Sequence, residues 1–249
     1  MFKVNDLVTR SSYSNDVIFR IISIDNGNVK IKGEVIRLIA DAPISDLVSY
    51  DVRNKVKFAL PSLSRPNNLI GGRILHIDGD AYYLSKAIET YKSYNIEAYG
   101  YYIEENKIEE VIISLIQKHN PDIVVITGHD SLKQKEKIYE LESYQNSAYF
   151  VNAIKRIRSI YRSKDELIII AGACQSYYEK LIESGANFAS SPSRKNIHLF
   201  DPVIVASLVS LTRIYETIDI DKMIELTYSK EIGGIDTKGV ARRNIYKKK

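Results

Sequence analysis

The sequence predicts an α/β protein with a mostly parallel, doubly wound sheet, preceded by a small N-terminal β-domain. The first observation is a pair of continuous aliphatic runs, at 123–126 and 167–171. Such runs are typical of strands buried on both faces at the centre of a parallel sheet. The second is that, from residue 73 onward, runs of this kind alternate with amphipathic segments of helical length, the pattern of repeated βα units.

The expected elements alternate along residues 73–249. The expected strands are 73–77, 98–102, 123–127, 167–171 and 186–190, and the expected helices are 82–94, 108–119, 146–159, 177–184, 203–210 and 220–229. Right-handed crossovers bring the carboxyl ends of parallel strands to one edge of the sheet. Ligands of open α/β sheets bind beyond those ends, so this edge is where we expect the functional residues.

Residues 1–50 have a different pattern. Short β-branched segments at 6–10, 17–24, 28–32 and 35–40 alternate in part, and Asp25-Asn26-Gly27-Asn28 is suited to a tight hairpin turn. We therefore expect a small SH3-like β-barrel over 1–50. Residues 51–72 contain Pro61, Pro66 and Gly71-Gly72, which predicts a linker to an α/β catalytic domain at 73–249.

Composition excludes several classes of protein. An apolar fraction of 45% is that of a folded chain, and no apolar run approaches the ~20 residues of a membrane span. The N-terminus lacks the apolar core of a secretory signal, and a single cysteine cannot form an internal disulfide, so we expect a cytoplasmic protein. The net charge of +4 comes without a basic patch interleaved with aromatic residues, which does not favour nucleic-acid binding.

Two of the expected strands end at reactive side chains. Gly128-His129-Asp130 follows one strand, and Gly172-Ala173-Cys174, with the only cysteine of the chain, follows another 45 residues on. A thiol is only a few per cent thiolate at neutral pH and needs an adjacent imidazole to act as a nucleophile. A lone cysteine after an apolar run is commonly a core residue, but the histidine at a second strand end favours a cysteine hydrolase.

The remaining polar candidates are weaker. Ser191 lies in the run Ser190–Ser193, whose hydroxyls would line a substrate groove or simply belong to a polar loop. His76 and His119 are interpreted as structural, and His198 is a second choice for the base. One cysteine makes a zinc site improbable, and we expect no metal and no cofactor.

The strand-then-His and strand-then-Ala-Cys arrangement resembles the caspase-like (clan CD) cysteine peptidases. Their signature Q-A-C-[RQG]-G, with a histidine about 50 residues upstream, is matched here only at Ala173-Cys174-Gln175. In those peptidases glycine usually follows the histidine, whereas here Gly128 precedes it and Asp130 follows. A Cys-His dyad without a carboxylate is usual in that group, so the resemblance names no third catalytic member.

A more extensive resemblance covers nearly the whole chain. Five blocks are similar to the YabG family of sporulation-specific peptidases of Bacillus and Clostridium: Val35–Asp41, Leu75–Asp80, Ile126–Asp130, Ala171–Ser176 and Ala186–Arg194. The resemblance implies a peptidase of the developing spore, in the mother-cell compartment, that cleaves after arginine in coat and cortex-associated proteins. An arginine-directed site needs a desolvated carboxylate for the guanidinium.

Asp78 and Asp80, at the end of the first strand of the α/β domain, are the candidates for that carboxylate, with Ser191 beside them in the substrate site. The alternative reading of Asp78-Gly79-Asp80 is a turn. Asp130 is the next candidate, and Asp201 a weaker one.

The sequence thus predicts a cysteine endopeptidase in which Cys174 attacks the scissile carbonyl and His129 gives a proton to the leaving amine. Backbone N–H groups at Gly128, Asp130 and Cys174 are expected to hold the oxyanion. Its partners would be protein substrates, including itself: Arg65 lies in the linker, with Arg53, Arg73 and Arg242-Arg243 as alternative sites because Pro66 disfavours cleavage after Arg65. The alternatives are an amidotransferase-like cysteine amidohydrolase, which usually has a Gly-x-Cys-x-Gly elbow absent here, and a non-enzymatic spore assembly module.

Overall fold

A computed structural model describes residues 2–51, 59–63 and 69–243 of the chain, so most of the predicted linker 51–72, with Arg53 and Arg65, lies outside the described residues. The chain divides into two compact units, Met1–Leu60 and Pro61–Lys249. Among the helices described, none is long and apolar enough to cross a membrane.

The first unit is an antiparallel sheet in the order β4-β3-β2-β1-β5. Its strands are β1 Leu7–Arg10, β2 Phe19–Asp25, β3 Asn28–Gly33, β4 Ile39–Pro43 and β5 Leu47–Ser49. The inward side chains, among them Val8, Ile21 and Ile31, form its core. The fourth strand begins later than the expected 35–40, because the Gly33 N–H bonds to the Leu38 carbonyl and closes a tight loop over 34–37.

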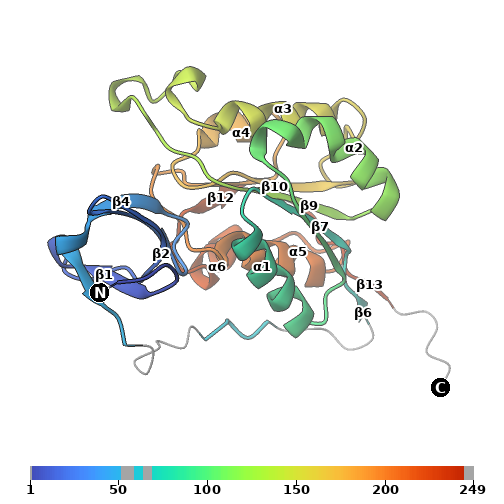
Figure 1. Ribbon diagram of the computed structural model, residues 1–249. Helices are drawn as coiled ribbons and strands as arrows, with labels where there is room; N and C mark the ends of the chain where they lie inside the picture. The colour runs from blue at the N-terminus through green and yellow to red at the C-terminus, as the bar shows by residue number, and fades with distance from the viewer. Residues whose placement is uncertain (1, 52–58, 64–68, 244–249) are drawn as a thin grey trace. The chain divides into compact units, whose positions relative to one another are not determined.

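The second unit contains a six-stranded sheet in the order β12-β11-β10-β9-β7-β8 (Figure 1). Its strands are β7 Ile74–Asp78, β8 Ala98–Tyr102, β9 Ile123–Thr127, β10 Ile168–Ala171, β11 Phe188–Ser190 and β12 Ile232–Gly234. The first five are parallel and β12 is antiparallel to β11. The prediction of an α/β class with a mostly parallel sheet is confirmed.

Helices cover both faces of this sheet (Figure 1). They are α1 Ala81–Ser93, α2 Ile108–His119, α3 Ser147–Arg158, α4 Tyr178–Glu183, α5 Asp201–Leu211 and α6 Ile220–Leu226. One face packs against α2, α3 and α4 in a core with Ile112, Phe150 and Leu181, and the other against α1, α5 and α6 in a core with Tyr91 and Val205. Two separate cores explain why β7, β9 and β10 are buried at every position and are mostly aliphatic.

The edge strand β12 was not predicted, whereas β8 at the other edge was. β12 has the sequence Ile-Gly-Gly, which carries little strand propensity. Its glycines are required by packing, because a Cβ at Gly233 would lie 2.5 Å from the Tyr178 hydroxyl and one at Gly234 would lie 2.1 Å from the Phe188 ring. A short antiparallel pair, β6 Leu69–Ile70 with β13 Arg242–Arg243, was also not expected.

Strand order identifies the sheet edge at which a ligand site is expected. From β7 the chain passes to β8 on one side and then returns to β9 on the other side of β7. A reversal of this kind opens a crevice beyond the carboxyl ends of the two central strands. Asp78, the last residue of β7, pairs with Thr127, the last residue of β9, so Asp80 and His129 leave the sheet side by side.

Candidate active site

His129 is held by a carboxylate. Its Nε2 lies 2.9 Å from Oδ2 of Asp80, whose side chain is only 9% exposed. The other oxygen, Oδ1, accepts the N–H groups of Tyr82 (2.9 Å) and Tyr83 (3.3 Å) and so caps the start of α1. An ionised carboxylate only accepts, so this contact keeps the proton on Nε2 and leaves Nδ1 as the basic nitrogen of the neutral ring.

The backbone beside His129 is fixed by Glu105, which precedes α2. The His129 N–H donates to Glu105 Oε1 at 2.7 Å. That oxygen would lie 2.2 Å from a Cβ at Gly79 and 2.4 Å from a Cβ at Gly128. Glycine at both turns therefore admits the Glu105 side chain between the ends of β7 and β9, rather than supplying an unusual backbone angle.

Asp78 lies beneath this pair and has no exposure to solvent. It accepts the Thr127 hydroxyl at 2.7 Å and the Asp80 N–H at 2.9 Å. Thr127 Oγ1 in turn lies 2.8 Å from His76 Nε2, whose Nδ1 contacts the Tyr91 hydroxyl at 3.0 Å. This buried network supports the Asp80 turn, and a guanidinium would have to break it to reach Asp78.

Cys174 follows a sharp turn after β10. Gly172 has a φ of +109°, in the left-handed region that favours glycine, and this turn directs the chain out of the sheet. The thiol is buried, with the residue 3% exposed, and its Sγ accepts the Ile197 N–H at 3.2 Å.

A loop that runs from Ser191 to Ile197, called here the 191–197 segment, passes over the turn that carries Cys174. Its Ser191 hydroxyl and its Lys195 carbonyl both accept the Gln175 N–H, each at 3.1 Å, and the Ser191 hydroxyl donates to the Lys195 carbonyl at 2.6 Å. Ser191 is thus fully buried, and its hydroxyl links Gln175 to Lys195 by hydrogen bonds.

Among the residues that the structure describes, the carboxylate of Asp130 is hydrogen-bonded, whereas its backbone N–H is not. The carboxylate is buried and accepts from Ser147, Ser131 and Asn146. Burial raises the pKa of Asp130, and the hydrogen bonds from these groups oppose that rise. Within the described part of the chain, its backbone N–H has no hydrogen-bond acceptor.

His198 and Asp201 are buried residues with structural contacts beside the candidate site, rather than a second catalytic pair. His198 is 3% exposed and stacks on Tyr228 with ring centroids 4.2 Å apart, and burial lowers its pKa to about 4. Asp201 accepts the N–H groups of His198, Tyr228 and Ser229, and burial raises its pKa. These bonds end α6 at Leu226, before the expected end at 229.

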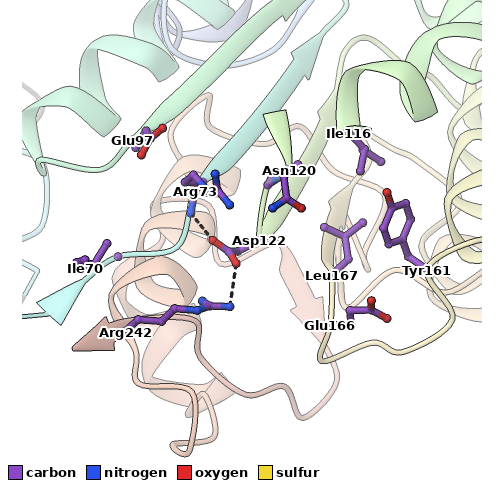
Figure 2. Close-up of a pocket in the computed structure, with 12 residues that line it drawn as sticks. Ile70, Arg73, Glu97, Ile116, Asn120, Asp122, Tyr161, Glu166, Leu167 and Arg242 are labelled. Atoms are coloured by element: carbon purple, nitrogen blue, oxygen red, sulfur yellow. Dashed lines mark hydrogen bonds and ion pairs between the residues drawn. The ribbon is translucent and has the colours of Figure 1, made fainter. Parts of the chain in front are cut away.

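A cavity of about 600 Å³ lies at the opposite edge of the sheet, beside the amino ends of β7 and β9 (Figure 2). Asp122 bridges its wall, with the Arg73 N–H 2.8 Å from Oδ2 and Arg242 Nη2 3.0 Å from Oδ1. Neither cysteine nor histidine lines it. The cavity therefore lacks the groups that hydrolysis by a thiol requires.

Two contacts of the candidate site were not anticipated: Asp80 with the His129 ring, and Glu105 with the His129 backbone. Asp80 precedes an expected helix, and an aspartate there is a standard N-cap signal, so its place at the start of α1 was readable. Its second contact was not, because it depends on the neighbouring strand. Glu105 carried no signal in the sequence.

Comparison with known proteins identifies a peptidase family. The family model described as YabG peptidase U57 matches residues 3–68 and 66–246. The sporulation-specific protease YabG of Bacillus subtilis (strain 168) is 38% identical to the chain over 280 aligned positions, which cover 97% of each protein.

Proposed function

The chain belongs to the YabG peptidase U57 family and is a sporulation peptidase, and we propose that it is a cysteine endopeptidase with Cys174 as nucleophile and His129 as base. The observation that carries the proposal is the 2.9 Å contact between His129 Nε2 and Asp80 at the same sheet edge as the thiol. A histidine oriented by a carboxylate is the usual partner of an activated nucleophile.

In this mechanism Nδ1 of His129 takes the thiol proton, and Sγ of Cys174 attacks the scissile carbonyl carbon. The imidazolium then protonates the leaving amine, and water hydrolyses the thioester with the same base. Asp80 acts through His129, because its carboxylate accepts the Nε2 proton and fixes the orientation of the ring. It therefore supplements the dyad inferred from the sequence as a positioning residue.

The oxyanion would be held by backbone N–H groups, with Asp130 and Cys174 as the principal pair and Gly128 as the further candidate. Support comes from the Asp130 N–H, which has no acceptor among the described residues, whereas the His129 N–H is bonded to Glu105. The buried Asp130 carboxylate holds the turn that carries this N–H.

We also propose the finer fold assignments: a caspase-like catalytic domain over 73–249 and an SH3-like barrel over 1–50, joined by a linker over 51–72. The doubly wound sheet with its antiparallel sixth strand supports the first, and the five-stranded antiparallel sheet supports the second.

The substrates we propose are spore coat and cortex-associated proteins, cleaved after arginine in the mother-cell compartment. Asp78, Asp80 and Ser191 were the residues expected to bind arginine. All three are buried in internal hydrogen bonds, so binding through them would require the edge to rearrange.

Self-cleavage is a further expected activity. Incubated wild-type chain should be cut after Arg53 or Arg73, or near Arg242-Arg243, because arginines in or beside a linker are available to an arginine-directed peptidase, whereas Pro66 disfavours the bond after Arg65. Mass spectrometry of the new N-termini checks this. A chain that stays full length while digesting an added protein excludes self-cleavage.

The decisive experiment compares wild-type and Cys174→Ala protein on a spore-protein extract, with new N-termini identified by mass spectrometry. New termini that follow arginine in the wild-type sample alone are expected. Ammonia release from glutamine without new termini would identify an amidohydrolase, and the absence of both would favour an assembly module.

A further inference from the structure

Glu231 is a buried acid at the catalytic edge that the proposed mechanism does not use. It immediately precedes β12, and its side chain is 10% exposed. In the described structure its carboxylate has two partners: the Ser193 N–H at 3.2 Å from Oε2, and the Lys195 ammonium at 3.4 Å from Oε1. The Lys195 side chain is 69% exposed, so this ion pair is weakly held on the lysine side.

The position of Glu231 is set from both directions. Its carbonyl accepts the Ser191 N–H, and the Ser191 hydroxyl accepts the N–H of Gln175, the residue after the nucleophile. Downstream, Ile232 pairs with Ser190 in the sheet, and upstream Asp201 holds Ser229. The backbone of Glu231 is therefore fixed in position, two hydrogen bonds away from the turn that carries Cys174.

Other carboxylates of this edge have stronger internal partners. Asp78 and Asp80 are engaged with Thr127 and His129. Glu179 makes a two-point contact with the Arg194 guanidinium, at 3.1 and 2.6 Å, and that arginine is only 13% exposed. Glu231 differs because, within the part of the chain that the structure describes, its one charged partner is the solvent-exposed ammonium of Lys195.

We propose that Glu231 binds the arginine side chain on the acyl side of the scissile bond, and that Lys195 occupies this carboxylate until substrate displaces it. The inference rests on the proposed peptidase function and assigns its specificity to one residue. A guanidinium offers two parallel N–H donors to a carboxylate, whereas the lysine ammonium offers a single point contact. Replacement of the Lys195 ammonium by the substrate guanidinium is therefore favourable. A neutral substrate side chain could not replace the ammonium in this way, because it carries no charge to pair with the mostly buried carboxylate.

The test uses full-length protein and peptides that are identical except for arginine, lysine or citrulline at that position. Citrulline keeps the shape of arginine and lacks its charge. Wild-type kcat/KM should favour arginine over citrulline by at least about 100-fold. Glu231→Gln should lose most of that ratio by slowing arginine cleavage and sparing citrulline.

Two further variants keep the test decisive. Glu179→Gln is the matched control and should preserve the arginine-to-citrulline ratio. Lys195→Ala removes the competing cation, so the KM for the arginine peptide should fall several-fold, and this holds even if Glu231→Gln proves unstable.

The outcomes separate two failures. If wild type cleaves none of the peptides or the extract, the peptidase proposal fails. If wild type prefers arginine and Glu231→Gln keeps that preference, or Lys195→Ala leaves KM unchanged, the assignment of Glu231 is overturned.

Discussion

The two edges of the parallel sheet carry similar charged residues in different settings. At the carboxyl edge, Asp80 and Asp130 are buried and each is fixed by several hydrogen bonds. At the amino edge, Asp122 meets the 54%-exposed Arg242 beside an open cavity of about 600 Å³. The comparison teaches that oriented, desolvated groups mark the candidate catalytic site, although the amino edge has the conspicuous hollow.

The largest expected effect is the loss of activity on replacing the proposed catalytic residues, and its absence would overturn the contrast between the two edges. Cys174→Ala and His129→Ala should each lower kcat/KM by on the order of 10⁴-fold or more, because a nucleophile and its base act as one unit. Each variant should keep the wild-type thermal midpoint within a few degrees. Near-normal cleavage by folded Cys174→Ala protein would move the chemistry away from the carboxyl edge.

The next prediction separates the two roles of Asp80. Asp80→Asn should lower kcat by about 10²- to 10⁴-fold with little change in stability, because asparagine still caps α1 but cannot hold the His129 tautomer. Asp80→Ala should lose the cap as well, at about 1 kcal/mol of unfolding free energy. Kinetics and urea unfolding of the pair check this, and equal activity of Asp80→Asn and wild type would refute the positioning role.

A third prediction concerns the pH dependence of stability that buried His198 causes. His198 accepts the Phe200 N–H at Nδ1, and its pKa falls to about 4 in the folded protein, so the unfolded chain binds a proton more readily. Stability should therefore fall as pH drops from about 6.5 to 4, by about 3 kcal/mol.

Urea unfolding at pH 7 and 4.5 measures this loss, with His198→Gln as the reference. Asp201, whose pKa is raised by burial, holds its proton more readily when folded and opposes part of the change. The difference between wild type and variant isolates His198, and identical pH slopes would contradict the prediction.

The smallest effect belongs to the amino edge. Asp122→Ala removes the acceptor of the Arg73 N–H and the partner of Arg242, at about 1 kcal/mol. Peptide cleavage should stay within twofold of wild type. A loss of activity without unfolding would show that the cavity takes part in function, and would weaken the contrast between the edges.

Sequence pattern was most informative where one local rule decided the structure. Continuous aliphatic runs predicted β9 and, to within a residue, β10, and helical spacing predicted α2 at its observed bounds. β12 escaped, because its glycines fit the Tyr178 and Phe188 rings and not a strand pattern.

The contacts of the candidate site were not predicted, for the same reason: they depend on parts of the chain that are distant in sequence. Strand order brings Asp80 to His129, and that order is a property of the whole sheet. Burial of Ser191 and Glu231 likewise follows from the path of the 191–197 segment, which no local pattern specifies.

The Glu105 carboxylate between two glycine turns has an evolutionary consequence. A methyl group at either Gly79 or Gly128 would collide with Glu105, and loss of Glu105 would release the His129 backbone. These three positions are therefore coupled: an alanine at either glycine would push the Glu105 carboxylate away from the His129 N–H, so its effect on the His129 backbone depends on residue 105. A chain that keeps Glu105 on the His129 N–H should therefore keep glycine at both 79 and 128, whereas a chain with a shorter residue 105 is free to change either one.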